Sequence, residues 1–129
     1  MLIDDYFQRI ETKIDDCINI LESSLLKDKR SPHIGIIEGK LVFKDESILH
    51  FIEFVNVKQT VVVYKYSYHY QSRQGELLFR YDMAPHHKEI KTFPHHKHIN
   101  LNSVISTAAP DLEQVLFEID DLIDQALIK

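Results

Sequence analysis

The sequence IGIIEGKLVF, residues 34–43, is the first of four runs rich in valine, isoleucine, phenylalanine and tyrosine. The other three are ILHFIEFVNV (48–57), VVVYKYSYHYQ (61–71) and ELLFRYD (76–82). Residues of these types are enriched in β-strands, and only short polar segments separate one run from the next. Because loops this short join antiparallel neighbours, the sequence predicts a four-stranded antiparallel meander.

Two amphipathic helices are predicted to flank this meander. In the first segment, apolar residues recur at spacings of three and four from Ile3 to Leu25, and Pro32 ends the pattern. In the last segment, a similar stripe begins after Pro110 and extends to Leu127. The expected fold class is therefore α+β: an N-terminal helix, the four strands, a histidine-rich loop and a C-terminal helix. Both helices are expected to pack on one face of the sheet.

Length and composition predict a single domain that spans residues 1–129. Hydrophobic residues make up 44% of the chain and charged residues 27%, which is typical of globular proteins and excludes disordered and collagen-like classes. The net charge of −5 excludes a uniformly basic nucleic-acid-binding surface. The longest apolar run is too short to span a bilayer, no signal-peptide pattern opens the chain, and the lone Cys17 cannot form an internal disulfide. We therefore expect a cytoplasmic protein with no membrane partner.

The expected strand registers sort the side chains onto two faces of the sheet. Loop lengths place Glu53 opposite both Glu38 and Lys65, and Lys65 opposite Asp82. One face is then apolar, includes His50, and is expected to lie under the helices. The other face combines apolar residues such as Phe51 and Val63 with a polar set: Glu38, Lys40, Glu53, Lys65, Ser67, His69, Arg80 and Asp82.

A histidine-rich segment follows the fourth run. Residues 83–98, MAPHHKEIKTFPHHKH, hold five histidines: His86, His87, His95, His96 and His98. The segment contains neither C-x-x-C nor H-E-x-x-H, the common zinc signatures. His96 and His98 nevertheless share one side of an extended segment. With Asp82 or Glu53 they would form a two-histidine, one-carboxylate set for a divalent transition metal.

A different combination of residues fits metal-independent cleavage of RNA at the 2′-hydroxyl. That reaction needs a general base, a general acid and a cation near the phosphate. We expect His69 and a loop histidine such as His96 to act as base and acid, and Arg80 to bind the phosphate. Glu53 and Asp82 would orient these histidines or Lys65. The expected substrate-binding residues include Tyr68, whose ring offers a plane for an unstacked base; the set is Lys65, His86, His87, His95, Lys97 and Tyr68.

Two further interpretations are compatible with the sequence. In a non-catalytic binding module, the mixed face of the sheet would dock a partner protein or a second copy of the chain, and changes at Phe51 or Val63 would destroy association. In a metal-dependent hydrolase, His96, His98 and Asp82 would hold the ion. Independently of function, Arg80 and Asp82 are also spaced to form a salt bridge along one strand.

Four strings of the chain resemble the TumE family: LHFIEF (49–54), YSYHY (66–70), RYDMAPHH (80–87) and TFPHHKH (92–98). The resemblance covers nearly the whole chain and implies the toxin half of a small prokaryotic toxin–antitoxin module. It also implies a cognate antitoxin, expected to be a helix-turn-helix DNA-binding protein, but no particular reaction. The positions that match the family strings are Glu53, His69, Arg80, Asp82, His86, His87, His95, His96, Lys97 and His98.

Overall fold

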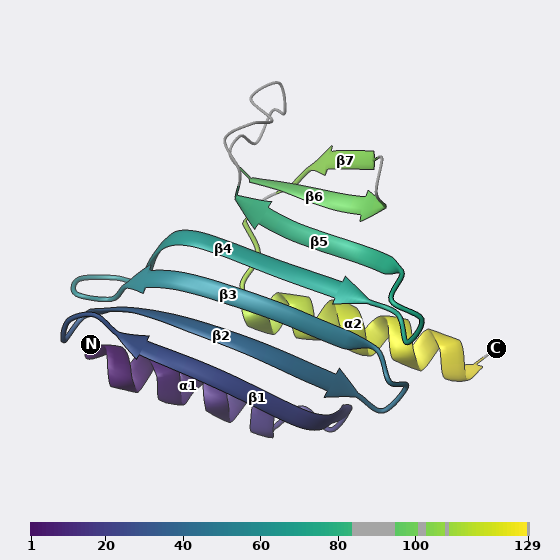
Figure 1. Cartoon of the computed structure of the whole chain (residues 1–129), viewed down its shortest axis with the longest axis horizontal. Coiled ribbons are helices and arrows are strands. Elements are labelled where there is room, and N and C mark those ends of the chain that lie inside the picture. The colour runs from purple at the N-terminus through teal and green to yellow at the C-terminus, as the bar shows by residue number, and fades with distance from the viewer. Residues whose placement is uncertain (84–94, 101–102, 108, 129) are drawn as a thin grey trace.

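The computed structural model describes residues 1–83, 95–100, 103–107 and 109–128. Within this part of the chain, seven strands form one antiparallel sheet in the order β1 to β7 (Figure 1). The strands are β1 (Ile20–Lys29), β2 (Ile34–Phe43), β3 (Ile48–Asn56), β4 (Val62–Gln71), β5 (Leu77–Met83), β6 (His95–Asn100) and β7 (Ser103–Ser106). The helices are α1 (Ile3–Asp15) and α2 (Leu112–Ile128).

The α+β class, the antiparallel meander and the C-terminal helix are confirmed. Strands β2 to β5 correspond closely to the four predicted runs. The prediction of four strands is wrong, because β1 precedes the meander and β6 and β7 follow it. Strand β6 comes from the histidine-rich segment, which the sequence predicted as a loop.

The prediction of a single long first helix is also wrong, because α1 ends at Asp15. The buried stripe of the helix is complete within that length: Ile3, Tyr6, Phe7, Ile10 and Ile14. The last turn is closed by hydrogen bonds from the Asp16 N–H to the Thr12 carbonyl at 3.0 Å and from the Cys17 N–H to the Ile14 carbonyl at 3.1 Å. The segment that follows pairs with β2 along its length, so the sheet satisfies its backbone groups.

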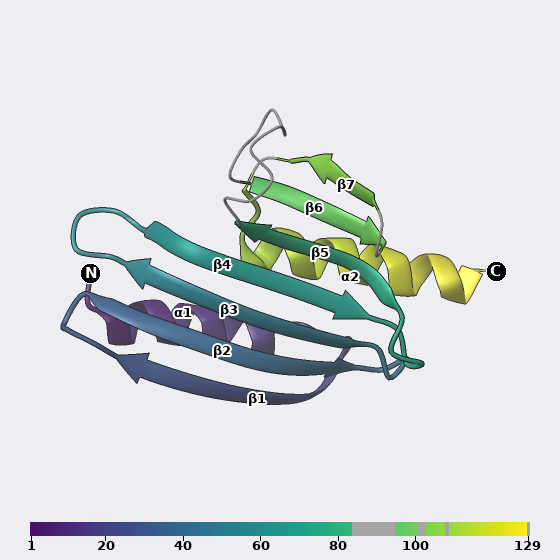
Figure 2. The ribbon, with the colours of Figure 1, turned by 45° about the horizontal axis from the view of Figure 1, so that its top comes forward.

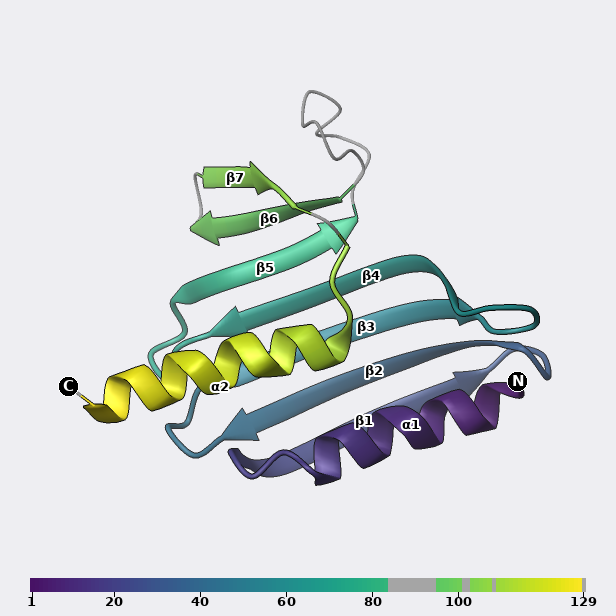
Figure 3. The ribbon, with the colours of Figure 1, turned by 180° about the vertical axis from the view of Figure 1, so that it is seen from behind.

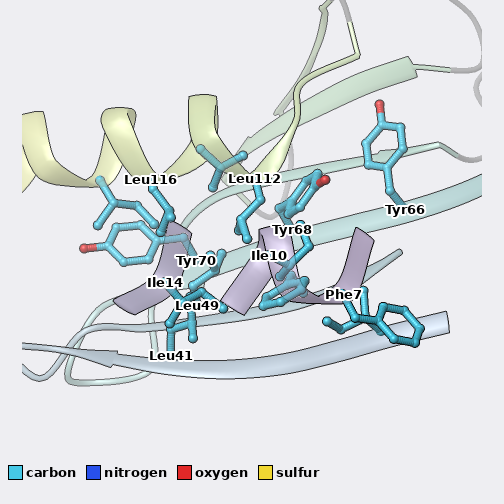
Figure 4. Packing of buried hydrophobic residues seen from close by; sticks show 14 of the residues in the cluster. Phe7, Ile10, Ile14, Leu41, Leu49, Tyr66, Tyr68, Tyr70, Leu112 and Leu116 are labelled. Carbon is cyan, nitrogen blue, oxygen red and sulfur yellow. The ribbon is translucent and has the colours of Figure 1, made fainter. Parts of the chain in front are cut away.

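Both helices pack on the same face of the sheet, as predicted. Figure 3 shows α1 and α2 in front of the strands, and Figures 1 and 2 show the sheet from the side that neither helix covers. The core lies between these layers. In Figure 4, Ile10 of α1 and Leu112 of α2 approach Tyr68 and Leu49 of the sheet, and all four side chains are buried.

Among the residues that the structure describes, neither helix is long and apolar enough to cross a membrane.

The turn between β2 and β3 changes the predicted register by one residue. Glu46 has a positive φ of 67°, and the Phe43 N–H donates to the Ser47 carbonyl at 2.9 Å. The loop therefore contains three residues with a left-handed last position, which is a common hairpin geometry. Val42 pairs with Ile48 in consequence. A slip of one residue turns every side chain of β3 to the other face.

This slip moves the alternate residues of β3 between the two layers. Leu49, Phe51 and Val55 are buried beneath the helices, so the prediction that Phe51 lies on an exposed docking face is wrong. The Phe51 ring occupies the space that a side chain at Gly39 would need. His50 is exposed on the opposite face, so its predicted place in the core is wrong as well.

Irregularities in two other strand pairs change the predicted charge pairings. A register shift between Phe54 and Val55 places Glu53 opposite Tyr66 rather than Lys65. On β2, Glu53 pairs with Ile37 rather than Glu38. A second register shift occurs in the β4–β5 pair, between Tyr70 and Gln71. In this pair Asp82 lies opposite Ser67 rather than opposite Lys65, its predicted partner. These pairings place Glu53 and Asp82 on different faces of the sheet.

Candidate functional site

The face of the sheet opposite the helices, called the open face here, carries a row of basic and imidazole side chains. The strand registers align one residue from each of five consecutive strands, from β2 to β6. This basic row consists of Lys40, His50, His69, Arg80 and His98. Because directly opposed residues lie on the same face of a sheet, these side chains are neighbours although they are distant in sequence.

A second row runs beside the basic row, two residues away from it on each of three strands. It joins Ser67 of β4, Asp82 of β5 and His96 of β6. Cross-strand pairs and their diagonal neighbours are within reach of long side chains. The two rows therefore place Asp82 next to Arg80 and both β6 histidines.

A hollow in the open face is lined by four residues of the basic row, Lys40, His50, His69 and Arg80, but not by His98. The hollow has a volume of about 540 Å³, which is within the range of small-ligand sites. This sheet hollow is lined by Ser24, Leu26, Glu38, Gly39, Lys40, His50, Phe51, Ile52, Ser67, His69, Gln71 and Arg80. Its polar side chains include two histidines, an arginine and a lysine, which suits a phosphate-containing ligand.

His69 and Arg80 meet across the β4–β5 pair. Arg80 Nη1 lies 3.4 Å from His69 Nδ1, and the rings of His50 and His69 are 6.5 Å apart between centroids. Burial lowers the pKa of His69, and the charge of Arg80 and the neighbouring His50 lower it further. His69 is therefore neutral near pH 7, the form in which an imidazole accepts a proton.

Asp82 connects Arg80 to the histidines of β6. Its Oδ2 accepts a hydrogen bond of 2.9 Å from Arg80 Nε, which confirms the predicted salt bridge. Its Oδ1 lies 2.6 Å from Nε2 of His96 and 3.4 Å from Nε2 of His98. His96 is only 1% exposed, so it is poorly placed to meet an RNA substrate. Burial lowers the pKa of His98 despite the opposing effect of Asp82.

Asp82, His96 and His98 are the described residues that together could hold a metal ion. One ligand atom from each side chain lies within 4.8 Å of the others. This matches the set of two histidines and one carboxylate that the sequence suggested. The alternative that used Glu53 as the carboxylate is wrong, because Glu53 lies on the other face.

Glu53 is instead buried on the helix-covered face. Tyr6 of α1 donates a hydrogen bond to Glu53 Oε1 at 2.5 Å, and Tyr68 of β4 donates to Oε2. Burial raises the pKa of Glu53, although the two hydroxyl donors oppose the shift. The structure thus separates Glu53 from His69 and Arg80, and its contacts join α1 to the sheet.

Three predicted substrate-binding residues also point toward the helices. Tyr68 is buried, so its ring is not accessible to a base. His95 stacks on Tyr66 with ring centroids 5.8 Å apart. Lys97 Nζ lies 2.9 Å from Glu118 Oε2 of α2, which fixes the helix to β6.

Three predicted substrate-binding residues remain: Lys65, which lies on the open face, and His86 and His87, which the structure does not describe. Lys65 is exposed. It lies two residues before Ser67 and four before His69 on β4, so the three side chains point to the same face of the sheet. His50 was not predicted as a site residue, because the three-residue turn before β3 contains no glycine to mark its left-handed position, which Glu46 occupies.

Comparison with known proteins gives one family. The family model described as "Toxin TumE" matches residues 10–127. No curated protein and no solved structure matches the chain. The matched range includes every strand described above, and therefore both rows of the open face.

Proposed function

Because the chain belongs to the Toxin TumE family and is thus a toxin component of a toxin–antitoxin system, we propose that it acts by cleaving RNA in the sheet hollow. The observation that carries this proposal is the alignment of His50, His69 and Arg80 in the basic row, where all three line one hollow. Two imidazoles and a guanidinium are the groups that phosphodiester transfer requires.

His69 is the proposed general base of the reaction. It takes the proton of a ribose 2′-hydroxyl, and the resulting oxygen attacks the adjacent phosphorus. The bond from that phosphorus to the 5′-oxygen breaks, and His50, in its protonated form, gives a proton to the departing oxygen. The products are a 2′,3′-cyclic phosphate and a 5′-hydroxyl, so no external reactant is consumed.

Arg80 is the proposed phosphate ligand. Its Nε is engaged by Asp82 and its Nη1 faces His69, so the guanidinium is held beside the proposed base. A fixed cation stabilises the extra negative charge of the pentacoordinate phosphorus in the transition state. Lys40, at the end of the basic row, supplies a second positive charge for a flanking phosphate.

The proposal is tested in cells by comparing growth after expression of the wild-type chain with growth after expression of Arg80→Ala. Expression of the wild-type chain is expected to arrest growth and to degrade cellular RNA, whereas Arg80→Ala is expected to do neither at equal protein level. Arg73→Ala is the matched control, because Arg73 forms an exposed salt bridge with Glu46 outside the hollow. Arrest by Arg80→Ala at the wild-type level would contradict the proposal.

Membership of a toxin family implies an antitoxin partner, and we propose that this partner is a helix-turn-helix DNA-binding protein. Co-expression with the adjacent gene product is expected to restore growth, and the two proteins should co-purify. Restoration by a protein with no DNA-binding activity in a mobility-shift measurement would contradict this assignment.

A further inference from the structure

We infer that Asp82, His96 and His98 form a binding site for a divalent transition-metal ion of the zinc class. The site lies at the β5–β6 pair, beyond Arg80 as viewed from the sheet hollow. The inference does not depend on RNA cleavage, since the three residues lie outside the lining of the hollow.

Regular strand pairing brings the three ligands together. Asp82 lies directly opposite His96 in the β5–β6 register, and His98 lies opposite Arg80, two residues before Asp82 on β5. Alternation along β6 places both imidazoles on the side that carries the Asp82 carboxylate. The ligands therefore come from paired strands, which position side chains more rigidly than a loop.

The distances between the ligand atoms suit a small ion. In a tetrahedral site with bonds of about 2.0–2.1 Å, ligand atoms lie about 3.3 Å apart. Asp82 Oδ1 is 3.4 Å from His98 Nε2 and 2.6 Å from His96 Nε2, and all three ligand atoms fall within 4.8 Å of one another. Adjustments of less than about 1 Å in side-chain position would produce the required spacing.

The surroundings of Asp82 favour coordination through one oxygen. Arg80 Nε binds Oδ2 at 2.9 Å and so leaves Oδ1 directed toward the two histidines. Hydrogen bonding to the second carboxylate oxygen is a common way of orienting a ligand, and its loss weakens metal affinity. His96 is almost fully buried, whereas the side chain of His98 is 19% exposed, which leaves a route by which an ion can enter.

The donor set selects the class of ion. Imidazole nitrogen suits Zn²⁺, Co²⁺ and Ni²⁺, and a single carboxylate does not provide the oxygen-rich shell that Mg²⁺ and Ca²⁺ prefer. Three protein ligands leave at least one coordination position for water or a phosphate oxygen. A bound ion would also connect β5 to β6 and thereby stabilise this part of the sheet.

Titration of the chelator-treated full-length protein with Co²⁺ tests the inference. We expect visible d–d absorption typical of low-coordinate cobalt, saturation at one ion per chain, and displacement by Zn²⁺. With Zn²⁺ at about a hundredfold excess over its Kd, the Tm should rise by about 10 °C. Absence of both the absorption and the Tm shift would overturn the inference.

Variants distinguish this site from other histidines of the chain. His98→Ala should weaken Co²⁺ binding by at least about a hundredfold and abolish the Tm shift. Asp82→Asn should weaken binding by about tenfold or more while preserving side-chain shape. The matched control His33→Ala removes a histidine of the segment between β1 and β2, whose Nδ1 lies 2.7 Å from the Met1 carbonyl oxygen, and should bind as the wild type does. Loss of binding in this control, or unchanged binding in His98→Ala, would place the ion elsewhere and overturn the assignment.

These measurements are read separately from RNA cleavage. Metal binding without cleavage would support the site and contradict the proposed function. Cleavage by a protein that binds neither Co²⁺ nor Zn²⁺ would support the function and contradict the site.

Discussion

Glu53 and Asp82 are buried carboxylates of the same sheet, but they lie on opposite faces and contact different groups. Glu53 is 1% exposed beneath the helices, where two tyrosine hydroxyls donate to it. Asp82 is 9% exposed on the open face, where it contacts Arg80 and the histidines of β6. The sequence placed both residues in one polar cluster.

The difference between their contacts indicates different roles. The two hydroxyls that donate to Glu53 belong to Tyr6 and Tyr68, which are themselves buried, so neither they nor the carboxylate can reach a substrate. The contacts of Glu53 therefore serve to hold α1 against the sheet. Asp82 instead orients a guanidinium and two imidazoles, which are the side chains that bind phosphate, metal ions and protons. Buried acidic residues alone do not identify a site; the groups around them do.

Replacement of the proposed base should have the largest effect. His69→Ala is expected to lower the rate of RNA cleavage by about 10²–10⁴-fold, the usual contribution of general acid–base catalysis. The free energy of unfolding should change by less than about 1 kcal/mol, because His69 is only partly buried on the open face. Cleavage of a fluorescent RNA by purified protein measures the rate, with His33→Ala as the histidine control. An unchanged rate in His69→Ala would remove His69 from the mechanism.

Removal of the covered carboxylate should affect stability but not chemistry. Glu53→Ala leaves the buried hydroxyls of Tyr6 and Tyr68 without their acceptor and creates a cavity, so we expect a loss of about 2–4 kcal/mol in unfolding free energy. Urea titration measures this loss, and Glu76→Ala, an exposed substitution, should change stability by less than about 0.5 kcal/mol. A folded Glu53→Ala protein that no longer cleaves RNA would contradict the separation of the two faces.

The ionisation of Glu53 should give the protein a specific pH dependence. Because its folded-state pKa is raised above 4.5, the folded state holds this proton more tightly than the unfolded state does. The corresponding stability is present below pH 4.5 and is lost as pH rises through the raised pKa. Glu53→Gln should remove this loss. The difference in unfolding free energy, Glu53→Gln minus wild type, should therefore increase with rising pH, by at most about 1.4 kcal/mol per pH unit. A difference that stays constant with pH would contradict the raised pKa of Glu53.

The smallest expected effect is a shift in the pKa of His69. His69 faces His50 of β3, Arg80 of β5 and Gln71 of its own strand, and its pKa is lowered from 6.5. A base must be deprotonated, so the acidic limb of kcat/KM should lie below pH 6.5. Arg80→Gln removes one cause of the lowering, so the pKa of the His69 ring, followed by NMR titration without any need for cleavage, should rise by less than about one pH unit. A pKa of His69 that falls in Arg80→Gln would contradict the contribution of the Arg80 charge.

The main elements of the sheet could be predicted because their signals are local. Alternating apolar residues and short polar turns define β2 to β5 within a few residues of their observed bounds. The end of α1 was missed because apolar residues from Ile18 to Leu25 continue a helical spacing by coincidence. Their backbone groups find partners along β2, which no local pattern reveals.

The composition of the site was harder to predict than its location. His69, Arg80 and Asp82 were assigned correctly to one face. The observed pairing of β5 with β4 differs from the predicted pairing by two residues, and a shift by an even number leaves each side chain on its face. Glu53 and His50 were exchanged between the faces by one left-handed residue, Glu46. A three-residue loop without glycine has no distinctive sequence, so only the structure could establish the side-chain orientation of β3.

The central claim, that the open face cleaves RNA, is tested most directly by identifying the ends of the cleaved strands. Purified protein is incubated with a defined single-stranded RNA and with the same RNA carrying a 2′-deoxy substitution at the cleavage position. The account predicts a 2′,3′-cyclic phosphate and a 5′-hydroxyl from the first substrate and no cleavage of the second. Products that end in a 3′-hydroxyl and a 5′-phosphate, or no cleavage of either RNA, would contradict it.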